Sequence, residues 1–471
     1  MVAATDARTT RSLPSIGPIS TLPAHTSSPM GPEVDPVTSD ANLPARADVV
    51  VIGGGIIGVS SALFLAERGI AVVVVEKGHV AGEQSGRNWG WCRQANRDPR
   101  EFDLIRESLV LWRGLNQRVE ADTGFRAAGI LHAARDEETE QKYVEWVQLA
   151  AASGIRAVVA RGAELARLLP GDTSPPRAAL YCASDGRAEP QRAAPAIARD
   201  ARRAGATIVT NCAARGIETA GNRVVSVITE RGAVACTSVV VAGGAWSRRV
   251  LQDLAVTLPQ LKVLASVART TPIEGGPEAA VWDDVFAFRK RADGGYTIAN
   301  GRTTVVPVTP DSLRFFGAFT PALVMGWKAL RLRLDERFFI ELREAPSARV
   351  GRPSPYETTR VLDPAPDQRY LDLAMAALRA RFPCFASAKI AQSWAGFIDV
   401  TPDAVPVISP VDGISGLIVA TGFSGHGFGI GPGAGHLVAD LVSGAKPLVE
   451  PREFRLSRYF DGSKPRPVGG F

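Results

Sequence analysis

The stretch ADVVVIGGGIIGVSSALFLAERGIAVVVVEK, residues 47–77, reads as a strand, a tight turn, a helix and a second strand in immediate succession. Residues 49–52 are continuously apolar, as in a parallel strand that is covered on both faces. A helical segment follows the glycines and ends at Gly69, and residues 72–75 predict the second buried strand. This order of elements predicts an α/β domain that begins with a parallel β-α-β unit.

The turn between the first strand and the helix carries the pattern GxGxxG. Gly53 permits the tight turn, Gly55 lets a pyrophosphate approach the backbone, and Gly58 lets the helix lie close to the sheet. The helix start, with Ile56 and Ile57, offers free N–H groups and the positive end of the helix dipole to phosphates. The turn therefore predicts a phosphate-binding site, although a glycine-rich turn with a purely structural role is the alternative.

An acidic residue ends the second strand, about 20 residues beyond the glycines. The carboxylate of Glu76 suits the ribose hydroxyls of a dinucleotide and would repel a 2′-phosphate. Because strand, glycines, helix and acid stand in register, residues 47–77 predict a dinucleotide-binding unit, and we include Lys77 in it.

Composition limits the classes of protein that remain. The chain has 471 residues, 45% hydrophobic and 22% charged, which is typical of a globular protein with two or more domains. Its net charge of +6 is spread along the sequence, which hints at anionic substrates and not at nucleic acid. No run approaches the roughly 20 apolar residues that cross a bilayer. Five widely spaced cysteines argue against a disulfide framework or a zinc site and favour the cytoplasm.

Both ends of the chain are rich in proline and glycine. We interpret residues 1–45 as a disordered leader and residues 447–471 as a C-terminal tail that is loose from Asp461 onward.

Two further glycine-rich turns follow apolar strands. Residues 416–444 (GLIVATGFSGHGFGIGPGAGHLVADLVSG) predict a strand, a glycine loop and a helix, but no acid-terminated strand follows. Residues 239–251 (VVVAGGAWSRRVL) predict a third strand and turn that pack beside the first unit. Two glycine-rich helix starts about 360 residues apart indicate one long ligand that is held at both ends.

Four segments together resemble the FAD-dependent D-amino-acid oxidase superfamily. They are IGGGIIG with Glu76, AGGAWS at 242–247, TPDAVPVI at 401–408 and TGFSGHGFGIGPGAGHL at 421–437, and the last is most similar to the sarcosine oxidase and glycine oxidase branch. The resemblance covers residues 47–444. It implies a Rossmann-like FAD-binding domain with an inserted antiparallel-sheet substrate domain.

The domain boundaries that we predict are discontinuous. The FAD-binding domain comprises residues 46–95, 187–260 and 385–446, and the substrate domain comprises residues 96–186 and 261–384.

The segment SGRNWGWC, residues 85–92, has no apolar periodicity, and we call it the ribbon. The resemblance implies that it passes under the flavin, between pyrophosphate and ring. Trp91 and Trp89 would line an apolar substrate pocket, or else they pack between the domains. The cofactor-binding residues that we predict beyond the first unit are Ser85, Gly86, Asn88, Trp89, Gly90, Gly243, Trp246, Gly425, Gly427, Phe428 and Gly429.

The resemblance also implies the chemistry: a hydride passes from the carbon beside an amine to flavin N5, and water hydrolyses the resulting imine. A helix that begins near residues 431–435 would direct its N-terminus at the flavin edge that becomes negative on reduction. His426 would donate to the ring or to substrate, or it is held structurally in the loop.

Departures from the family pattern are informative. Members that bind flavin covalently use a cysteine or histidine where this chain has Gly396 and Gly90, so we expect non-covalent FAD. Ile398 and Gly429 stand where relatives place a carboxylate-binding arginine or lysine. The substrate is therefore an amino acid or a secondary or N-substituted amine.

Three arginines are candidates to replace the missing carboxylate ligand. Arg93 matches an arginine near flavin and substrate in sarcosine-oxidase-like members, although an ordinary surface ion pair is its alternative. Arg302 and Arg289 are further anion-binding candidates. We predict Arg93, His426 and Arg302 as the catalytic residues.

Residues 310–344 match no part of the family pattern. Leu323, Trp327, Leu330, Leu334 and Phe338 recur at helical spacing and predict one apolar stripe, with basic residues beside it. The stripe packs on its own domain or on a second subunit, or it contacts an anionic membrane through about residues 320–340, which suits a dehydrogenase that reduces quinone in place of oxygen.

Three functions remain open. The first is an FAD-dependent amine or amino-acid oxidoreductase, an oxidase or a dehydrogenase. The second is a flavoprotein subunit of a hetero-oligomeric amine dehydrogenase. The third is a flavin monooxygenase, which is disfavoured because only one complete nucleotide-binding unit is present.

Overall fold

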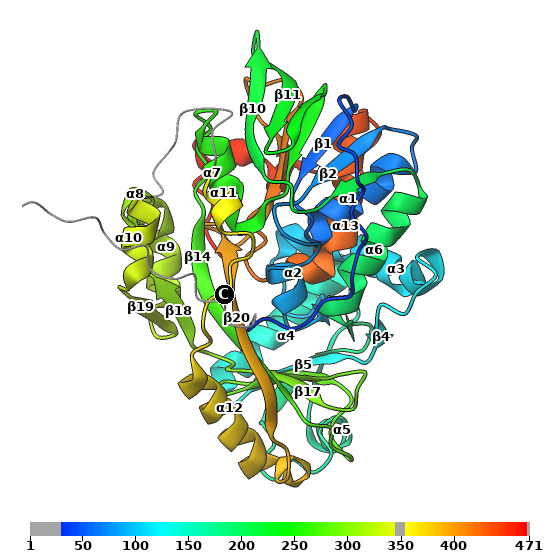
Figure 1. Cartoon of the computed structure of the whole chain (residues 1–471). Coiled ribbons are helices and arrows are strands. Elements are labelled where there is room, and N and C mark those ends of the chain that lie inside the picture. The colour runs from blue at the N-terminus through cyan, green and yellow to red at the C-terminus, as the bar shows by residue number, and fades with distance from the viewer. Residues whose placement is uncertain (1–29, 344–353, 469–471) are drawn as a thin grey trace, which may run out of the picture.

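The computed structural model describes residues 30–343 and 354–468. These residues form a mixed α/β protein in which a six-stranded sheet and a ten-stranded sheet dominate (Figure 1). The α/β fold class with parallel and antiparallel sheets is confirmed.

The six-stranded sheet has the order β21-β22-β13-β1-β2-β9. Its strands are β1 (Val49–Ile52), β2 (Val72–Val75), β9 (Thr207–Val209), β13 (Ser238–Val241), β21 (Val407–Pro410) and β22 (Leu417–Thr421). All pairs are parallel except β21 with β22. The three glycine-rich turns that the sequence predicts therefore follow β1, β13 and β22, which are neighbours in one sheet.

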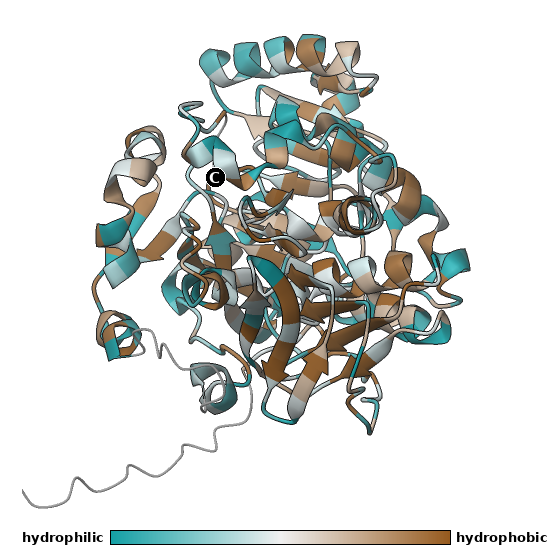
Figure 2. Cartoon of the chain, turned by 90° about the horizontal axis from the view of Figure 1, so that it is seen from above, coloured by the Kyte–Doolittle hydropathy of each residue, from teal (hydrophilic) through white to brown (hydrophobic). Residues whose placement is uncertain are grey.

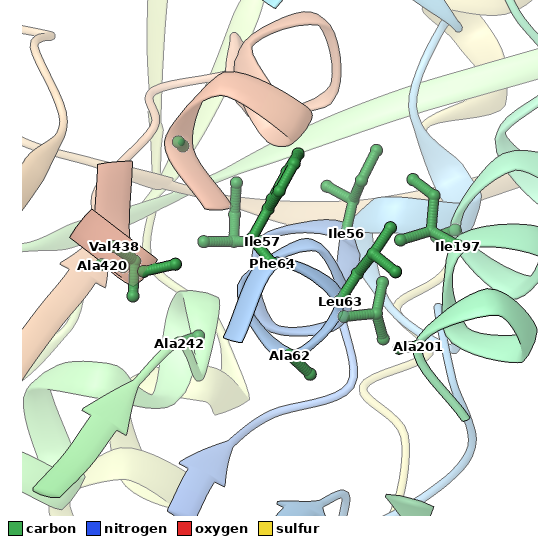
Figure 3. Packing of buried hydrophobic residues seen from close by; sticks show 14 of the residues in the cluster. Ile56, Ile57, Ala62, Leu63, Phe64, Ile197, Ala201, Ala242, Ala420 and Val438 are labelled. Carbon is green, nitrogen blue, oxygen red and sulfur yellow. The ribbon is translucent and has the colours of Figure 1, made fainter. Parts of the chain in front are cut away.

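One helix lies at the centre of the layer that covers this sheet. All eleven residues of α1 (Ile56–Ala66) are buried between α6 (Pro190–Arg203) and α13 (Gly427–Ser443), as Figure 3 shows. A Cβ on Gly435 would lie 2.4 Å from Cβ of Ser60 and 2.6 Å from its carbonyl carbon. The absence of side chains on this face of α13 lets the two helices approach closely.

Helix α3 (Phe102–Arg118) packs on the other side of α13. Ser108 Oγ donates to the carbonyl of Gly429 over 2.7 Å, and Trp112 Nε1 donates to the same carbonyl over 2.9 Å. These buried hydrogen bonds fix the first turn of α13 against the core.

The second large sheet has the order β19-β18-β14-β17-β16-β15-β5-β7-β6, with β20 paired to β14. Its strands are β5 (Ile130–Ala134), β6 (Val158–Ala160), β7 (Ala178–Cys182), β14 (Leu261–Thr270), β15 (Ala280–Trp282), β16 (Ala287–Lys290), β17 (Tyr296–Ala299), β18 (Thr304–Pro307), β19 (Leu330–Arg333) and β20 (Ile390–Val400). The pairs β5–β15 and β18–β19 are parallel and the others are antiparallel. Helix α12 (Gln368–Arg381) covers one face over an aromatic core.

Strand β20 was placed in the FAD-binding domain by the predicted boundary at residue 385, but it pairs with a strand of the other large sheet. It pairs with β14 along nearly its whole length, from Leu261 opposite Val400 to Thr270 opposite Ile390. Residues 390–400 therefore belong to the substrate-side sheet, because backbone pairing with β14 continues to the end of the strand.

Smaller elements complete the described structure. They are α2 (Gln84–Arg87), β3 (Trp91–Cys92), β4 (Arg126–Ala127), α4 (Glu137–Ala152), α5 (Gly162–Leu168), β8 (Gly186–Arg187), β10 (Ala214–Ala220), β11 (Arg223–Thr229), β12 (Gly232–Ala235), α7 (Ser247–Gln252) and α11 (Pro355–Thr358). Strands β3, β8 and β4 form a small sheet that contains the end of the ribbon. Figure 2 shows mostly hydrophobic strands in the interior and more polar outer helices.

The prediction of a disordered leader is wrong for residues 30–45, while residues 1–29 lie outside the described part of the chain. The amide of Asp35 donates to Gln191 O over 3.0 Å, and the carboxylate of Asp40 accepts from the amide of Ile208 over 2.7 Å and pairs with Arg202. The edge strand β9 offers unpaired backbone groups, and residues near Asp40 satisfy them.

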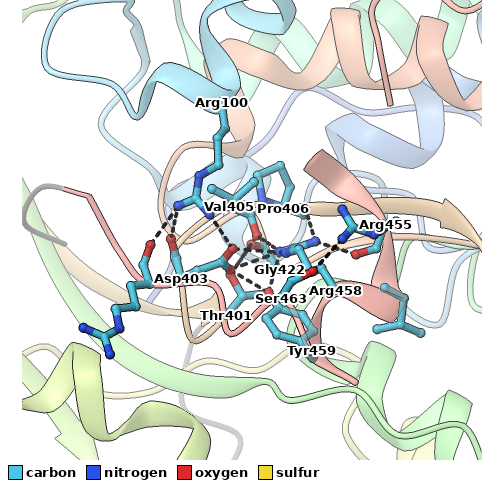
Figure 4. Close-up of polar contacts among 12 residues, drawn as sticks. Arg100, Thr401, Asp403, Val405, Pro406, Gly422, Arg455, Arg458, Tyr459 and Ser463 are labelled. Carbon is cyan, nitrogen blue, oxygen red and sulfur yellow. Dashed lines mark hydrogen bonds and ion pairs between the residues drawn. The ribbon is translucent and has the colours of Figure 1, made fainter. Parts of the chain in front are cut away.

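Within the predicted C-terminal tail, residues 447–471, the stretch before Asp461 forms two short 3-10 turns, at 452–454 and 456–459. The buried carboxylate of Asp403 pairs with Arg458, accepts from the hydroxyl of Tyr459 over 2.7 Å and pairs with Arg100 over 3.0 Å (Figure 4). The C-terminal segment thus satisfies the charge of a residue in the TPD segment.

The single apolar stripe predicted for residues 310–344 is wrong as well. The segment folds as α8 (Pro310–Arg314), α9 (Phe316–Gly326), β19 and α10 (Glu336–Arg343), and it projects on one side of the molecule (Figure 1). Strand β19 pairs with β18 and interrupts the helical spacing, so Trp327 and Leu334 are 69% and 68% exposed. Backbone pairing with an existing sheet edge overrides the helical periodicity here.

We predict that Gly435→Ala destabilises the fold, because its methyl group would overlap the backbone of α1. Such overpacking costs about 1–3 kcal/mol, sometimes more. The matched control is Gly317→Ala in α9, where a Cβ meets nothing within 4 Å. That variant should be neutral or more stable by about 0.5–1 kcal/mol. Chemical denaturation of both variants measures the difference, and equal stabilities would contradict the packing argument.

Candidate functional site

The three glycine-rich turns and the ribbon line one shared cavity. The predicted cofactor-binding residues that line it are Gly53, Gly55, Ile56, Ile57, Glu76, Lys77, Ser85, Asn88, Gly243, Trp246, Gly425, Gly427 and Phe428. The N-termini of α1 and α13 both open onto this space, so two helix dipoles present their positive ends to it.

Two glycines of the first turn serve backbone geometry. Gly53 has φ of +114°, and a Cβ there would lie 2.5 Å from the carbonyl oxygen of Ala242. A Cβ on Gly58, which is outside the cavity lining, would lie 2.0 Å from Gly53 O. These positions let β1, β13 and α1 meet closely at the cavity.

Charged and hydroxyl side chains hold the first turn. Ser85 Oγ accepts from the amide of Ile56 over 2.9 Å, which ties the ribbon to the start of α1. The carboxylate of Glu76 accepts from the amides of Gly54 and Gly78, each over 2.7 Å, and burial raises its pKa. Glu76 faces the cavity, where ribose hydroxyls could donate to the same carboxylate.

The ammonium of Lys77 is occupied within the protein. It pairs with Glu83 over 2.5 Å, donates to the carbonyls of Thr359 and Arg360, and lies 4.7 Å from the ring centroid of Trp246. Glu83 also accepts from Trp246 Nε1 over 3.1 Å. The sequence analysis missed Glu83, whose carboxylate links Lys77, just after β2, to Trp246 in the turn after β13.

The side-chain amide of Asn88 forms hydrogen bonds within the ribbon. Asn88 donates to the carbonyl of Ser85 over 2.8 Å and accepts from the amide of Gly90 over 2.7 Å. Gly90 has φ of +78°, and a Cβ there would lie 2.3 Å from Ala188 O. A residue with a side chain could not adopt this turn without moving the neighbouring backbone.

Gly86 and Gly429 pack against the backbone outside the cavity lining. A Cβ on Gly86 would lie 2.4 Å from Ala81 O, and one on Gly429 would lie 3.0 Å from Cα of Cys92. Gly429 thus lets the first turn of α13 pass directly beneath the end of the ribbon.

Arg289 anchors the ribbon and is not available to an anion. Its side chain is almost fully buried, forms two hydrogen bonds with Glu189 of 2.8 and 2.9 Å, and donates to the carbonyl of Trp89 over 2.5 Å. Burial opposes ionisation of Glu189, but Arg289 and Arg291 hold its pKa at about 2. The anion-binding role predicted for Arg289 is therefore replaced by a structural one.

Arg302 lies apart from the cavity. It is exposed in the turn between β17 and β18, where Asn300 Oδ1 accepts from its backbone amide over 3.1 Å. The structure does not bring Arg302 together with the other predicted catalytic residues, because this turn points outward.

Arg93 carries a charge without an acidic partner. Its guanidinium donates to the carbonyls of Ala95 over 2.5 Å and Asn96 over 3.3 Å. Across residues 30–343 and 354–468, no carboxylate lies within 4.0 Å of it, so an ordinary ion pair does not explain this side chain. Burial and the neighbouring Arg97 lower its pKa to about 9, which leaves it protonated at neutral pH.

His426 precedes α13 and is neutral. Its Nδ1 lies 3.6 Å from Glu101 Oε2, while Arg97 pairs with Glu101 over 3.2 Å and donates to His426 O over 3.1 Å. Burial and Arg97 lower the pKa of His426 to about 3. The sequence analysis missed Arg97 and Glu101, although their i, i+4 spacing was a weak signal.

Helix α13 begins at Gly427, four residues before the predicted start near 431–435. Glycines disfavour helix in isolation, but here Gly431 and Gly433 allow close contact with Ile56 and Ser108. Packing thus overrides propensity and brings the helix N-terminus to Gly427.

The two ribbon tryptophans join an aromatic cluster on the sheet side. The rings of Trp89 and Trp91 lie 5.1 Å apart, Trp91 and His132 6.1 Å, and His132 and Trp282 5.8 Å. Trp91 thus packs between the two parts of the protein, as one of the two interpretations expected.

Comparison with known proteins agrees with this geometry. Residues 48–441 match the family model described as FAD dependent oxidoreductase (DAO). The chain belongs to this family of FAD-dependent oxidoreductases.

Three relatives show the range of the family. The structure of L-amino acid deaminase from Proteus myxofaciens, in complex with anthranilate, is 34% identical, with a TM-score of 0.87 over 91% of this chain and 97% of that one. L-amino acid deaminase from Proteus vulgaris is 33% identical, with a TM-score of 0.86 over 90% of this chain and 100% of the other. Sarcosine oxidase subunit beta from Arthrobacter sp. is 26% identical over 88% of this chain and 91% of the relative.

The residues present fit FAD. Backbone amides at two helix starts face the cavity, Gly55 leaves the backbone open beside Ser85, and Glu76 stands at the end of β2. When bound, FAD supplies a two-electron acceptor that takes a hydride from a carbon next to nitrogen. The backbone near Gly55 and the two helix starts would hold its phosphates, and Glu76 would bind its ribose.

We predict that Glu189→Gln destabilises the ribbon, because it leaves Arg289 buried without a charged partner. Breaking such a pair costs about 3–5 kcal/mol. Since the folded pKa of Glu189 is lowered to about 2, the stabilisation is present above pH 4.5 and is lost as pH falls toward 2. Denaturation curves at pH 7 and pH 3 should show a difference between wild type and variant that shrinks at the lower pH, and a constant difference would contradict this assignment.

Proposed function

We propose that the chain oxidises the Cα–N bond of an amino acid to an imine, with water then releasing ammonia and a 2-oxo acid. The observation that carries this proposal is the half-buried guanidinium of Arg93 beside the ribbon, which has no carboxylate partner among the described residues and suits a substrate carboxylate. The 33–34% identity to two L-amino acid deaminases supports a primary amino acid as substrate.

The runner-up is the oxidation of a secondary amine by a flavoprotein subunit of a hetero-oligomer. The similarity to sarcosine oxidase subunit beta, whose name states a multi-subunit protein, supports this alternative. The untagged chain can be purified both from cells that contain its potential partner proteins and from cells that lack them. A partner subunit that the activity requires would co-purify in the first case.

The roles that we propose for the cofactor-binding residues follow the lining of the cavity, whereas Arg93 and His426 lie outside that lining. The positive helix ends and the backbone near Gly55 bind pyrophosphate, Glu76 binds ribose, and Phe428 and Ile398 contact the flavin ring. Arg93 orients the substrate, and neutral His426 donates a hydrogen bond to substrate or to the ring. Arg302 keeps no role in the site.

We propose that FAD is bound non-covalently, because Gly90 and Gly396 provide no nucleophile and a Cβ on Gly396 would lie 2.4 Å from Gln84 Oε1. Acid precipitation should therefore release all flavin into the supernatant, and yellow colour in the pellet would contradict this. Gly55→Val should abolish FAD content, since its side chain would fill the place of the pyrophosphate. The ratio of flavin absorbance to protein absorbance in the purified variant measures its FAD content.

The segment 310–343 exposes a surface that we name the insert surface. Its exposed apolar residues are Leu313, Phe316, Val324, Met325, Trp327, Leu332, Leu334, Phe339 and Leu342, and its exposed basic residues include Arg314, Lys328, Arg331 and Arg333. We propose that the insert surface contacts an anionic membrane surface, where quinone accepts the electrons; a homo-oligomer contact with oxygen as acceptor is the alternative.

Among the helices of the described residues, none is long and apolar enough to cross a bilayer. The five cysteines, all unpaired, support a location on the cytoplasmic side, where thiols stay reduced.

The proposed reaction is tested by mixing the holoenzyme anaerobically with L- and D-amino acids, sarcosine and simple amines while recording flavin absorbance. We expect bleaching by amino acids of one chirality, with ammonia and a 2-oxo acid as products. Bleaching by sarcosine with formaldehyde as product would favour the runner-up. Bleaching by none of these compounds would refute both.

A further inference from the structure

Three nitrogen atoms in the aromatic cluster are buried and have no hydrogen-bond partner among the described residues. They are Trp91 Nε1 and both ring nitrogens of His132. His132 is 3% exposed and lies between the rings of Trp91 and Trp282. These three nitrogen atoms are therefore shielded from solvent and unsatisfied, although the tryptophan rings around them are only partly buried.

The register of the large sheet places His132 on the face toward the ribbon. His132 pairs with Trp282 of β15, Trp282 with Ala287, and Ala287 with Ala299. Arg289, two residues beyond Ala287 and on the same face, donates to the ribbon carbonyl of Trp89. His132 thus projects from the substrate-side sheet toward the segment that surrounds the cofactor.

Unsatisfied buried polar atoms are costly, at about 1–3 kcal/mol each. Most buried polar groups in proteins have a partner, so three orphans in one cluster indicate a place that a ligand or ordered water completes. A neutral imidazole offers one N–H donor, and Trp91 offers another. Arg93 stands two residues after Trp91, and its charge acts on His132. Two N–H donors and a guanidinium together match the acceptors of a carboxylate.

The neutral state of His132 agrees with its surroundings. Burial lowers the pKa of His132 far below its usual value, and the nearby charge of Arg93 lowers it further. The other charged or titratable groups near Arg93 are Arg97, Asp185, Glu101 and Tyr143. Asp185 is engaged by the amides of Gln94 and Ala95, so it does not pair with Arg93.

We propose that Trp91 Nε1, His132 and Arg93 together form the subsite for the carboxylate of the substrate, in place of the arginine and lysine that Ile398 and Gly429 replace. Trp89 and Trp282 flank this subsite and favour amino acids with an apolar or aromatic side chain. This subsite rests on the proposed amino-acid oxidation, which it deepens by naming the residues that bind the acid group. Trp91 and His132 thereby become specificity-determining residues.

The experiment uses benzoate, an aromatic carboxylate that has no C–N bond to oxidise, and its neutral analogue benzamide. Isothermal titration of the FAD-loaded wild-type protein should show benzoate binding at least tenfold tighter than benzamide. Trp91→Phe and His132→Phe should each weaken benzoate binding about 5- to 30-fold, because each removes one donor to a charged group. Arg93→Lys should weaken it at least tenfold, because lysine lacks the planar two-point geometry.

The matched control is Trp327→Phe, which makes the same change at a tryptophan that is 69% exposed on the insert surface and lies outside the cluster. It should change the benzoate affinity less than twofold. His132→Asn retains an N–H donor and should restore part of the affinity that His132→Phe loses. If His132→Phe does not accumulate as holoprotein, Trp91→Phe and His132→Asn still decide the outcome, with FAD content and melting temperature recorded for each.

Equal affinities for benzoate and benzamide, or no benzoate binding at millimolar concentration, would overturn the subsite. Unchanged benzoate affinity in Trp91→Phe and His132→Phe would show that water alone completes these atoms. Selective benzoate binding through these residues without flavin bleaching by any amino acid would instead sink the proposed reaction and leave the anion subsite standing. Flavin bleaching by amino acids, with KM unchanged in both variants, would refute the anion subsite and leave the proposed reaction standing.

Discussion

The close packing of α13 on α1 is the constraint on which the rest of the structure depends. Helix α13 lacks side chains at Gly431 and Gly435, where it meets Ile56 and Ser60, so the two helices lie almost backbone to backbone. This contact joins segments separated by more than 350 residues and directs two helix N-termini into one cavity. The anionic part of a dinucleotide is thereby met by backbone amides from both ends of the chain.

Buried charge pairs hold the irregular segments that surround this cavity. Glu189 with Arg289 fixes the ribbon, Arg97 with Glu101 fixes the loop before α13, and Asp403 binds the C-terminal segment. Replacing such pairs with apolar residues is often neutral for stability, so their value here is positional. Each pair fixes the position of a backbone carbonyl or a turn, which apolar packing alone would not do.

The sequence predicts the parts of the fold that depend on local pattern. Strands at 49–52 and 72–75 and the glycine at Gly53 follow from apolar runs and turn geometry, and the structure places them as expected. It does not predict features that depend on distant partners. Arg289 was assigned to anion binding because its partner Glu189 lies 100 residues away in the sequence. The periodicity of residues 310–344 suggested one helix because the segment itself carries no signal for the pairing of β19 with β18.

The β14–β20 ladder has a mechanical consequence. Its paired strands begin beside the cofactor cavity, where Asp399 accepts from the amide of Gly422 over 2.6 Å, and run to the far side of the substrate-side sheet. A hinge between the two halves would have to break this continuous ladder of hydrogen bonds. The ladder therefore ties the cavity side of the molecule, near Asp399, to the far side of the substrate-side sheet through paired backbone.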